Sequence, residues 1–278
     1  MPTSSVAEIP DENGAEPRVH APAKRKKVAR CVRIRVGDLG PSERARVMSE
    51  LYEIYQETLV GPTREEFEKI YWSNDDSIMA RFYGVDGALA GFAESTVRHV
   101  ESRGRTYAVH SGAVVFSLAY RGGFSTVWFG MKEFMRIKLR EPTTPAVFIT
   151  RAVSPASYQL MASLGGWVYP SRHRPTPPEV EALVFDIARQ LKLKTDPANP
   201  WFQSAIARIR QPERLARSAA LKNNPDADFY RELTRDMRPD QMLILTAPVN
   251  LANIAVTTSR LVAAIVRTKL RKVGTPRS

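Results

Sequence analysis

The sequence is poor in metal-binding side chains and in long apolar runs, and both shortages exclude classes of protein. Its 278 residues include one cysteine and four histidines, with no CxxC or HxxxH spacing. Cys31 alone can form neither an intramolecular disulfide nor a cysteine-rich zinc site. No window reaches the ~18 consecutive apolar residues of a spanning helix. Residues 242–256 come closest, and Pro248 interrupts them. We therefore expect no metal site, no disulfide framework and no polytopic membrane protein.

Acidic side chains are missing from the end of the chain. Residues 241–278 contain six Lys or Arg and no Asp or Glu, and a second basic cluster runs from Lys24 to Lys27. The formal net charge of the whole chain is +12. Such an excess favours an anionic partner, either nucleic acid, an anionic membrane surface or a phosphate-bearing cofactor. Nucleic acid is the least favoured of the three, because the arginines are not interleaved with aromatic residues.

The first 29 residues are predicted to be a disordered basic tail. Residues 1–23 are rich in Pro, Glu, Ala and Ser and lack the apolar region of a secretory signal. Together with the single cysteine, this composition favours a cytoplasmic protein, and peripheral attachment to a membrane is left open.

Residues 30–175 are predicted to form one α+β domain. Asp86-Gly87 and Arg103-Gly104 are typical of tight turns, so three adjacent antiparallel strands are expected there. The predicted order is strand 31–36, helices 40–58 and 63–72, strands 78–84, 88–99 and 105–118, helix 124–140, strand 146–150, helix 154–165 and strand 167–169. The helix over 124–140 is expected to bury Val127, Trp128, Met131, Phe134, Met135 and Leu139.

Residues 176–278 are predicted to be a helical and irregular C-terminal extension. It holds a helix over 179–193, a stretch with little periodicity over 194–241, a strand over 242–246 and a helix over 249–272. In the last helix an apolar stripe faces away from Arg260, Arg267 and Arg271. This pattern suits an interfacial membrane helix or a docking helix, and also a helix packed on the body of the protein.

Two segments resemble the GNAT superfamily of acyl-CoA-dependent N-acyltransferases. The first, Phe116-Ser-Leu-Ala-Tyr-Arg-Gly-Gly123, is similar to that family's central strand and the turn before its cofactor helix. The second, Ser154-Pro-Ala-Ser-Tyr-Gln-Leu-Met-Ala-Ser-Leu-Gly165, is similar to its late helix. The resemblance covers about residues 31–170. It implies a central mixed, mostly antiparallel sheet flanked by helices.

The resemblance also implies a site for acetyl-CoA, a longer acyl-CoA or an acyl carrier thioester at the glycine turn. A strand that ends at a helix N-terminus directs backbone N–H groups into one concavity, which suits a pyrophosphate. The turn departs from the family pattern, because Leu118 stands where proline is usual and the small positions hold other residues. The cofactor-binding candidates are Leu118, Tyr120, Arg121, Gly122, Gly123, Phe124 and Ser125.

Acyl transfer to an amine needs a base for the amine proton, and the resemblance adds an acid for the leaving thiolate. His110 is the preferred base, because it shares strand parity with Val114 and Phe116 and titrates in a useful range. Glu94, on the neighbouring strand, is the second candidate. Met161 stands where the family often carries the tyrosine acid, and Tyr158 lies one helical turn earlier as a substitute.

These residues predict an acyltransferase that moves an acyl group from a thioester donor to an amine of unknown identity. The alternative is a GNAT-like module that binds or regulates without catalysis, in contact with an anionic membrane surface through 249–272. A second copy of the chain is retained as a further partner.

Overall fold

The computed structural model describes residues 26–72, 74–120, 125–164, 166–205, 207–209, 221 and 223–273. Most of the predicted tail and the turn 121–124 lie outside these ranges. The elements are β1 (Val28–Arg35), η1 (Val36–Asp38), α1 (Pro41–Thr58), β2 (Leu59–Val60), α2 (Arg64–Trp72), β3 (Ile78–Gly84), β4 (Leu89–Ser102), β5 (Arg105–Phe116), η2 (Leu118–Tyr120), α3 (Ser125–Arg140), β6 (Ala146–Ala152), α4 (Pro155–Leu164), α5 (Pro178–Gln190), β7 (Phe202–Ser204), β8 (Arg208–Ile209), α7 (Pro225–Leu233), β9 (Gln241–Pro248) and α8 (Leu251–Val273).

Local signals place the elements of the first half. The α2 helix begins in a reciprocal capping box, in which the Thr63 N–H donates to Glu66 Oε2 at 2.8 Å and the Glu66 N–H to Thr63 Oγ1 at 3.2 Å. Gly87 and Gly104 have φ values of +77° and +72° in the two tight turns, where a glycine avoids the strain of a Cβ. The three antiparallel strands β3, β4 and β5 are therefore confirmed.

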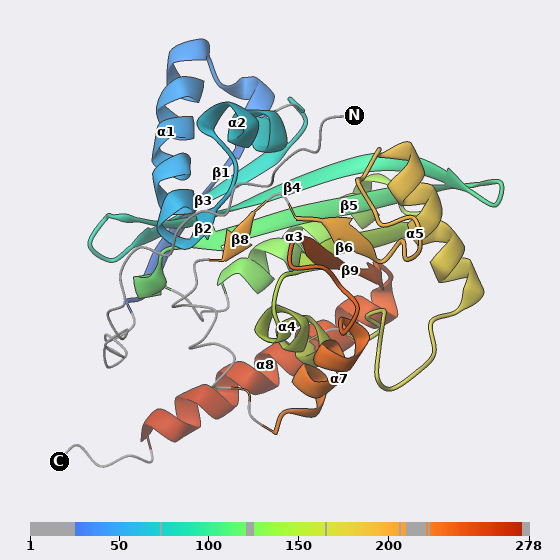
Figure 1. Ribbon diagram of the computed structural model, residues 1–278. Coiled ribbons are helices and arrows are strands. Elements are labelled where there is room, and N and C mark those ends of the chain that lie inside the picture. The colour runs from blue at the N-terminus through green and yellow to red at the C-terminus, as the bar shows by residue number, and fades with distance from the viewer. Residues whose placement is uncertain are drawn as a thin grey trace, which may run out of the picture.

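Seven strands form the main sheet, in the order β1-β3-β4-β5-β6-β9-β7 (Figure 1). Among the strands that the structure describes in this sheet, only β5 and β6 run parallel, and every other neighbouring pair is antiparallel. This confirms the α+β class and the mixed, mostly antiparallel sheet. The order of elements from β1 to α4 is the GNAT-like order that the sequence resemblance implied.

The predicted C-terminal extension completes this same sheet. Its strand β9 pairs with β6 over six residues, from Val147–Pro248 to Ala152–Leu243, and β7 adds the far edge. At the other end of the chain, β1 begins at Val28, so the predicted tail boundary at residue 29 falls inside a strand. The predicted strand 167–169 is reduced to one bridge between Tyr169 and Thr246.

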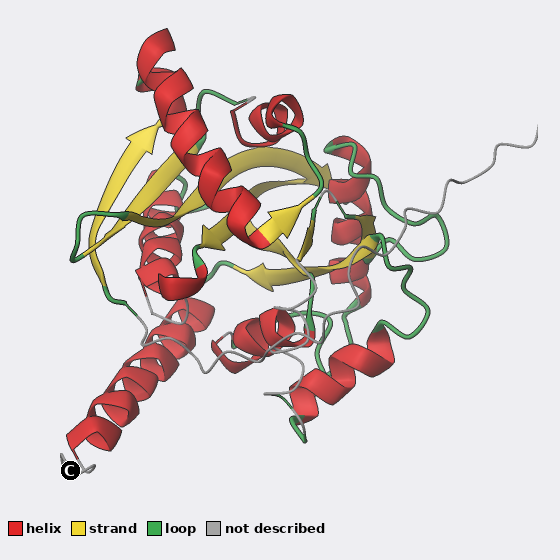
Figure 2. Cartoon of the chain, turned by 60° about the vertical axis from the view of Figure 1, so that its left-hand side comes forward, coloured by secondary structure: helices red, strands yellow, loops and turns green. Residues whose placement is uncertain are grey.

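Helices cover both faces of the sheet (Figures 1 and 2). The α1 and α2 helices pack with Phe92, and α5 packs with Val109, Ile149 and Ile244, all on one face. The other face carries α3, α4, α7 and the first part of α8. In Figure 2 the C-terminal part of α8 extends away from the body.

The buried side of α3 differs from the expected one. Met131 is buried and Val127 and Phe134 are half-buried, but Trp128, Met135 and Leu139 are 41%, 45% and 76% exposed. The helix instead buries Phe129, Ile137 and the charged Glu133. Arg33 and Arg136 pair with the Glu133 carboxylate, which allows an acid to occupy this face. Hydrophobic periodicity cannot indicate these two ion pairs, and the buried side that it predicts for the helix therefore differs from the observed one.

Candidate functional site

The parallel strands β5 and β6 are paired over only part of their length. They are paired only where residues 108–111 meet 146–149. Beyond that point β5 stays paired with β4 as far as Phe116, and β6 stays paired with β9 as far as Ala152. The last residues of the two strands therefore border a gap in the sheet, which we call the strand gap.

Strand alternation directs a backbone donor toward the strand gap, and an apolar side chain of the same residue is exposed on one sheet face beside it. The Ala108 N–H donates to Pro145 O on the β6 side, at 2.9 Å, whereas the Ser117 N–H donates to Ala90 O on the β4 side. Val114 shares the parity of Ala108, so its N–H also points to the β6 side, where the ladder has ended. The Val114 side chain is 56% exposed. An extended ligand in the gap would find a hydrogen-bond donor and apolar surface on β5.

Glu94 and Arg151 lie in one row across the strand gap. Glu94 on β4 is opposite Ala113 on β5, and continuing the β5–β6 register by two residues brings Arg151 level with Ala113. Residues opposite one another share a sheet face. Glu94 and Arg151 therefore face the α1 and α2 side. The charge of Arg151 lowers the pKa of Glu94, and the charge of Glu94 raises the pKa of Arg151.

Burial raises the pKa of Glu94 to about 8, although the charges of Arg151 and Arg98 oppose the shift. Thr96 Oγ1 donates to Glu94 Oε1 and is itself 2.9 Å from Ser77 Oγ, so the carboxyl is held in position. Near neutral pH this carboxyl exchanges a proton readily, which suits a general base or acid.

Tyr71 and Gln203 complete this cluster, and sequence reasoning missed both of them as well as Arg151. Burial raises the pKa of the Tyr71 phenol on α2, and the charge of Glu94 adds to the shift. Arg151 Nε donates to Gln203 Oε1 on β7 at 2.9 Å. Arg151 lies just past the predicted strand 146–150, and Gln203 lies in the stretch without periodicity. Only the pairing of β6 with the C-terminal strands brings them together.

His110 lies on the opposite sheet face from Glu94, with only 2% of its surface exposed. Its Nε2 is 2.6 Å from Ser95 Oγ, and its ring contacts Phe134 and Phe148. Nδ1 is buried and has no hydrogen-bond partner among the described residues, and burial lowers the pKa of the imidazole to about 3. The ring is therefore neutral at pH 7, and its role as the base stays a prediction.

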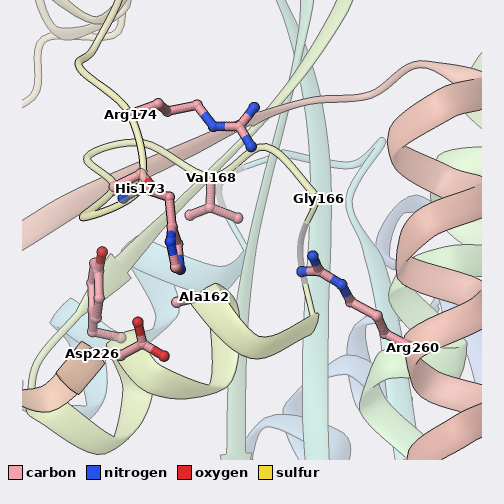
Figure 3. A pocket seen from close by; sticks show the side chains of 9 residues that line it. Ala162, Gly166, Val168, His173, Arg174, Asp226 and Arg260 are labelled. Carbon is pink, nitrogen blue, oxygen red and sulfur yellow. The ribbon is translucent and has the colours of Figure 1, made fainter. Parts of the chain in front are cut away.

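Tyr158 is buried in α4, and its hydroxyl donates to Pro170 O at 3.0 Å. Burial raises the pKa of this phenol to about 12. The side chain also lines a polar cavity of about 280 Å³ between α4, α7 and α8, shown in Figure 3. Met161 packs in the same core cluster as Tyr158. The assignment of Tyr158 as the acid stays a prediction.

The predicted cofactor turn is described only at its two ends. Tyr120 donates its hydroxyl to Asp86 at 2.7 Å, and Lys26 pairs with the same carboxylate at 2.8 Å. This contact anchors the end of η2 to the β3–β4 turn. Ser125 is the first residue of α3. Leu118 lies in η2, and Arg121, Gly122, Gly123 and Phe124 lie outside the described residues.

The described part of the chain contains neither a candidate metal-binding group nor a candidate membrane-spanning helix. There, no group of three His, Cys, Asp or Glu side chains is arranged to hold a metal ion. Within the same ranges, no helix combines the length and apolar character needed to cross a bilayer.

Comparison with known proteins finds likeness only among solved structures. No family model and no curated protein matches the chain. A protein of unknown function from Enterococcus faecalis, titled a probable N-acyltransferase, is 19% identical, with a TM-score of 0.34 over 49% of this chain and 32% of its own. This chain thus spans about a third of that protein. An acyl-CoA N-acyltransferase from Pseudomonas aeruginosa is 16% identical, with a TM-score of 0.30 over 44% of this chain and 78% of its own.

A third solved structure is the N-acetylglutamate synthase of Neisseria gonorrhoeae, complexed with coenzyme A and N-acetyl-glutamate. It is 11% identical, with a TM-score of 0.31 over 80% of this chain and 36% of its own. At these sequence identities and TM-scores, the three matches do not show what this chain does.

Proposed function

We propose that the protein transfers an acyl group from a thioester of coenzyme A or of an acyl carrier to an amine. The observation that supports this most is the strand gap with Glu94 and Arg151 at its side. Where two parallel strands are no longer paired, their free backbone groups can pair with an extended chain, such as the pantetheine arm of coenzyme A. The exposed Val114 side chain offers it apolar contact.

Each group at the gap has a defined task in this reaction. The amine nitrogen attacks the thioester carbonyl carbon, and the Val114 N–H donates to the oxygen on which negative charge develops. Glu94 accepts the proton that the amine loses. The new C–N bond forms, the C–S bond breaks, and the leaving thiolate takes a proton from water.

Glu94 is preferred to His110 as the base because of where the two side chains lie. Glu94 is half-buried beside the gap, and its pKa of about 8 makes it a stronger base than an ordinary carboxylate. His110 is enclosed by aromatic rings, and its pKa of about 3 makes it a weak base. Arg151, beside Glu94, keeps part of the carboxyl population ionised at neutral pH.

Calorimetry and turnover with the purified chain test the proposal. We expect acetyl-CoA or a long-chain acyl-CoA to bind, and a mixture of amines to release free thiol. Glu94→Gln should leave binding intact and reduce turnover by about 10²–10⁴. Absence of binding by both thioesters and by an acyl carrier thioester would overturn the proposal.

A second candidate, a binding module without catalysis, is favoured by Met161, since a thioether cannot protonate a thiolate. It predicts thioester binding with no thiol release in the parent chain. The same assay therefore separates the two functions.

A further inference from the structure

Arg151 uses only part of its hydrogen-bonding capacity within the protein. Its Nε donates to Gln203 Oε1 at 2.9 Å, and no described residue accepts a hydrogen bond from its terminal nitrogens, Nη1 and Nη2. Burial lowers the pKa of this guanidinium, because water is partly removed from the charge. Parallel N–H groups on a guanidinium match the two oxygens of a carboxylate. The terminal nitrogens of Arg151 are therefore suited to a carboxylate from outside the chain.

Glu94 does not supply that carboxylate. The charges of Glu94 and Arg151 act on each other, but these two described side chains form neither a hydrogen bond nor an ion pair. They stand on β4 and β6, two strand spacings apart, so their backbones are about 10 Å from each other even where the sheet is fully paired. The row thus holds an acid and a cation that are close without touching. A small molecule with an amine at one end and a carboxylate at the other complements this pair.

The segment that carries Gln203 borders the same row. Gln203 lies in β7, at the far edge of the sheet, and is 4% exposed. At Arg208 the chain enters β8, which pairs with β2 (Figure 1), and Ala207 packs with the core under α1 and α2. The chain therefore passes from the sheet edge to these helices, on the face that carries Glu94 and Arg151. Because Gln203 already holds the Arg151 guanidinium, little ordering is needed when a ligand binds.

We propose that the amine acceptor carries a carboxylate, which binds Nη1 and Nη2 of Arg151 while its amine faces Glu94. This inference rests on the acyl transfer proposed above and narrows the acceptor to aminocarboxylates, the class that includes the free amino acids. A carboxylate is favoured over a phosphate, because a second negative charge would lie close to Glu94 whenever that group is ionised. Arg151 thus determines acceptor specificity, and Gln203 positions it.

Thiol release with matched acceptor pools tests the proposal in the parent chain. One pool contains the standard amino acids with β-alanine and γ-aminobutyrate, a second the corresponding amides, and a third phosphoethanolamine and aminomethylphosphonate. Acetyl-CoA and a long-chain acyl-CoA serve as donors. We expect the carboxylates to react about tenfold or more faster than the amides at limiting concentration, as for loss of a charged hydrogen bond. Amides that react as fast as the acids, or phosphates that react faster, would overturn the proposal.

Matched variants assign the preference to Arg151. Arg151→Gln should bring the ratio of acid to amide rates close to one, chiefly through KM, and Arg151→Lys should keep only part of it. Arg98→Gln is the control, because the charge of Arg98 also acts on Glu94. Arg98 is exposed, about 13 Å along β4 from Glu94, and level with the paired part of β5 and β6.

The ratio separates contact from electrostatics. Both Arg151→Gln and Arg98→Gln remove a positive charge that lowers the pKa of Glu94, and a change in that pKa affects acids and amides alike. Only Arg151→Gln should change the ratio. An unchanged ratio in Arg151→Gln, or an equal fall in Arg98→Gln, would refute the assignment.

Binding measured without turnover distinguishes this inference from the acyl transfer on which it rests. Saturation-transfer NMR of each pool with the full chain and free coenzyme A reports which acceptors bind. If no thiol is released but the amino acids bind the parent chain and not Arg151→Gln, acyl transfer is wrong and the aminocarboxylate site stands. If acids and amides release thiol equally, acyl transfer stands and this inference is wrong. Absence of amino-acid binding to the parent chain would also overturn it.

Discussion

Replacing Glu94 by glutamine should change how the stability of the protein depends on pH. The ordinary pKa of 4.5 is raised to about 8 in the folded chain, a span of roughly 3.5 pH units. Within that span the folded state keeps the proton and the unfolded chain has released it. The free energy of unfolding of the parent chain therefore falls as pH rises from about 4.5 toward 8. Glutamine mimics the protonated carboxyl and removes this slope.

The size of the effect follows from the pKa. At ~1.36 kcal/mol per pH unit, the full span corresponds to at most ~5 kcal/mol. Partial contact with solvent and the nearby Arg151 charge reduce this, so we expect Glu94→Gln to gain about 2–3 kcal/mol relative to the parent between pH 5 and pH 8. Urea unfolding of both chains at pH 5, 6.5 and 8 measures the difference.

An exposed carboxylate provides the control. Lys69 lowers the pKa of Glu65, so the stabilisation from Glu65 is present at neutral pH and lost as pH falls. Glu65→Gln should therefore change the slope in the opposite direction and only at acidic pH. If the parent and Glu94→Gln chains lose stability in parallel between pH 5 and 8, then Glu94 is not desolvated and cannot be the base we describe. A pH-rate profile that does not rise toward pH 8 would lead to the same conclusion.

Three other predictions address the remaining candidates. His110→Ala removes a ring enclosed in the core, so we expect a loss of about 2–4 kcal/mol of stability with turnover per folded molecule within tenfold, measured by urea unfolding and thiol release; a turnover loss of 10² or more would make His110 the base. Arg121→Glu puts a carboxylate beside the expected pyrophosphate and should weaken acyl-CoA binding in calorimetry, whereas unchanged affinity would remove the turn from the site. For residues 249–272 we expect salt-sensitive co-sedimentation with anionic vesicles that Arg267→Glu and Val262→Asp both weaken; equal pelleting of all three chains would mean that α8 does not contact lipid.

Sequence patterns predicted the first half of the fold because its signals are local. The capping box at Thr63 and the two glycine turns act within a few residues, and each element they predict is present. The α7 helix was missed although Asn224 caps it and Pro225 opens it, because the stretch around it has little periodicity. Local signals without periodicity are easily overlooked.

The candidate site could be predicted only in part. Glu94 was found as a second candidate because the tight turn at Arg103-Gly104 predicts that its strand lies next to that of His110. The Arg151–Gln203 contact depends on which strands become neighbours, and that is decided by tertiary pairing across the sheet. The preference for His110 rested on its ordinary pKa, which the surrounding aromatic rings lower by excluding water.

The position of β9 has a consequence for how the chain assembles. In the finished sheet β6 is an interior strand, but its partner on one side is β9, and residues 153–240 lie between the two strands in the chain. Until residues 241–248 leave the ribosome, β6 presents an open edge rich in apolar side chains. Such an edge readily pairs with another chain. We therefore expect any fragment that ends before Gln241 to aggregate, so that the membrane and ligand properties of the C-terminal region are best studied by substitution in the full chain.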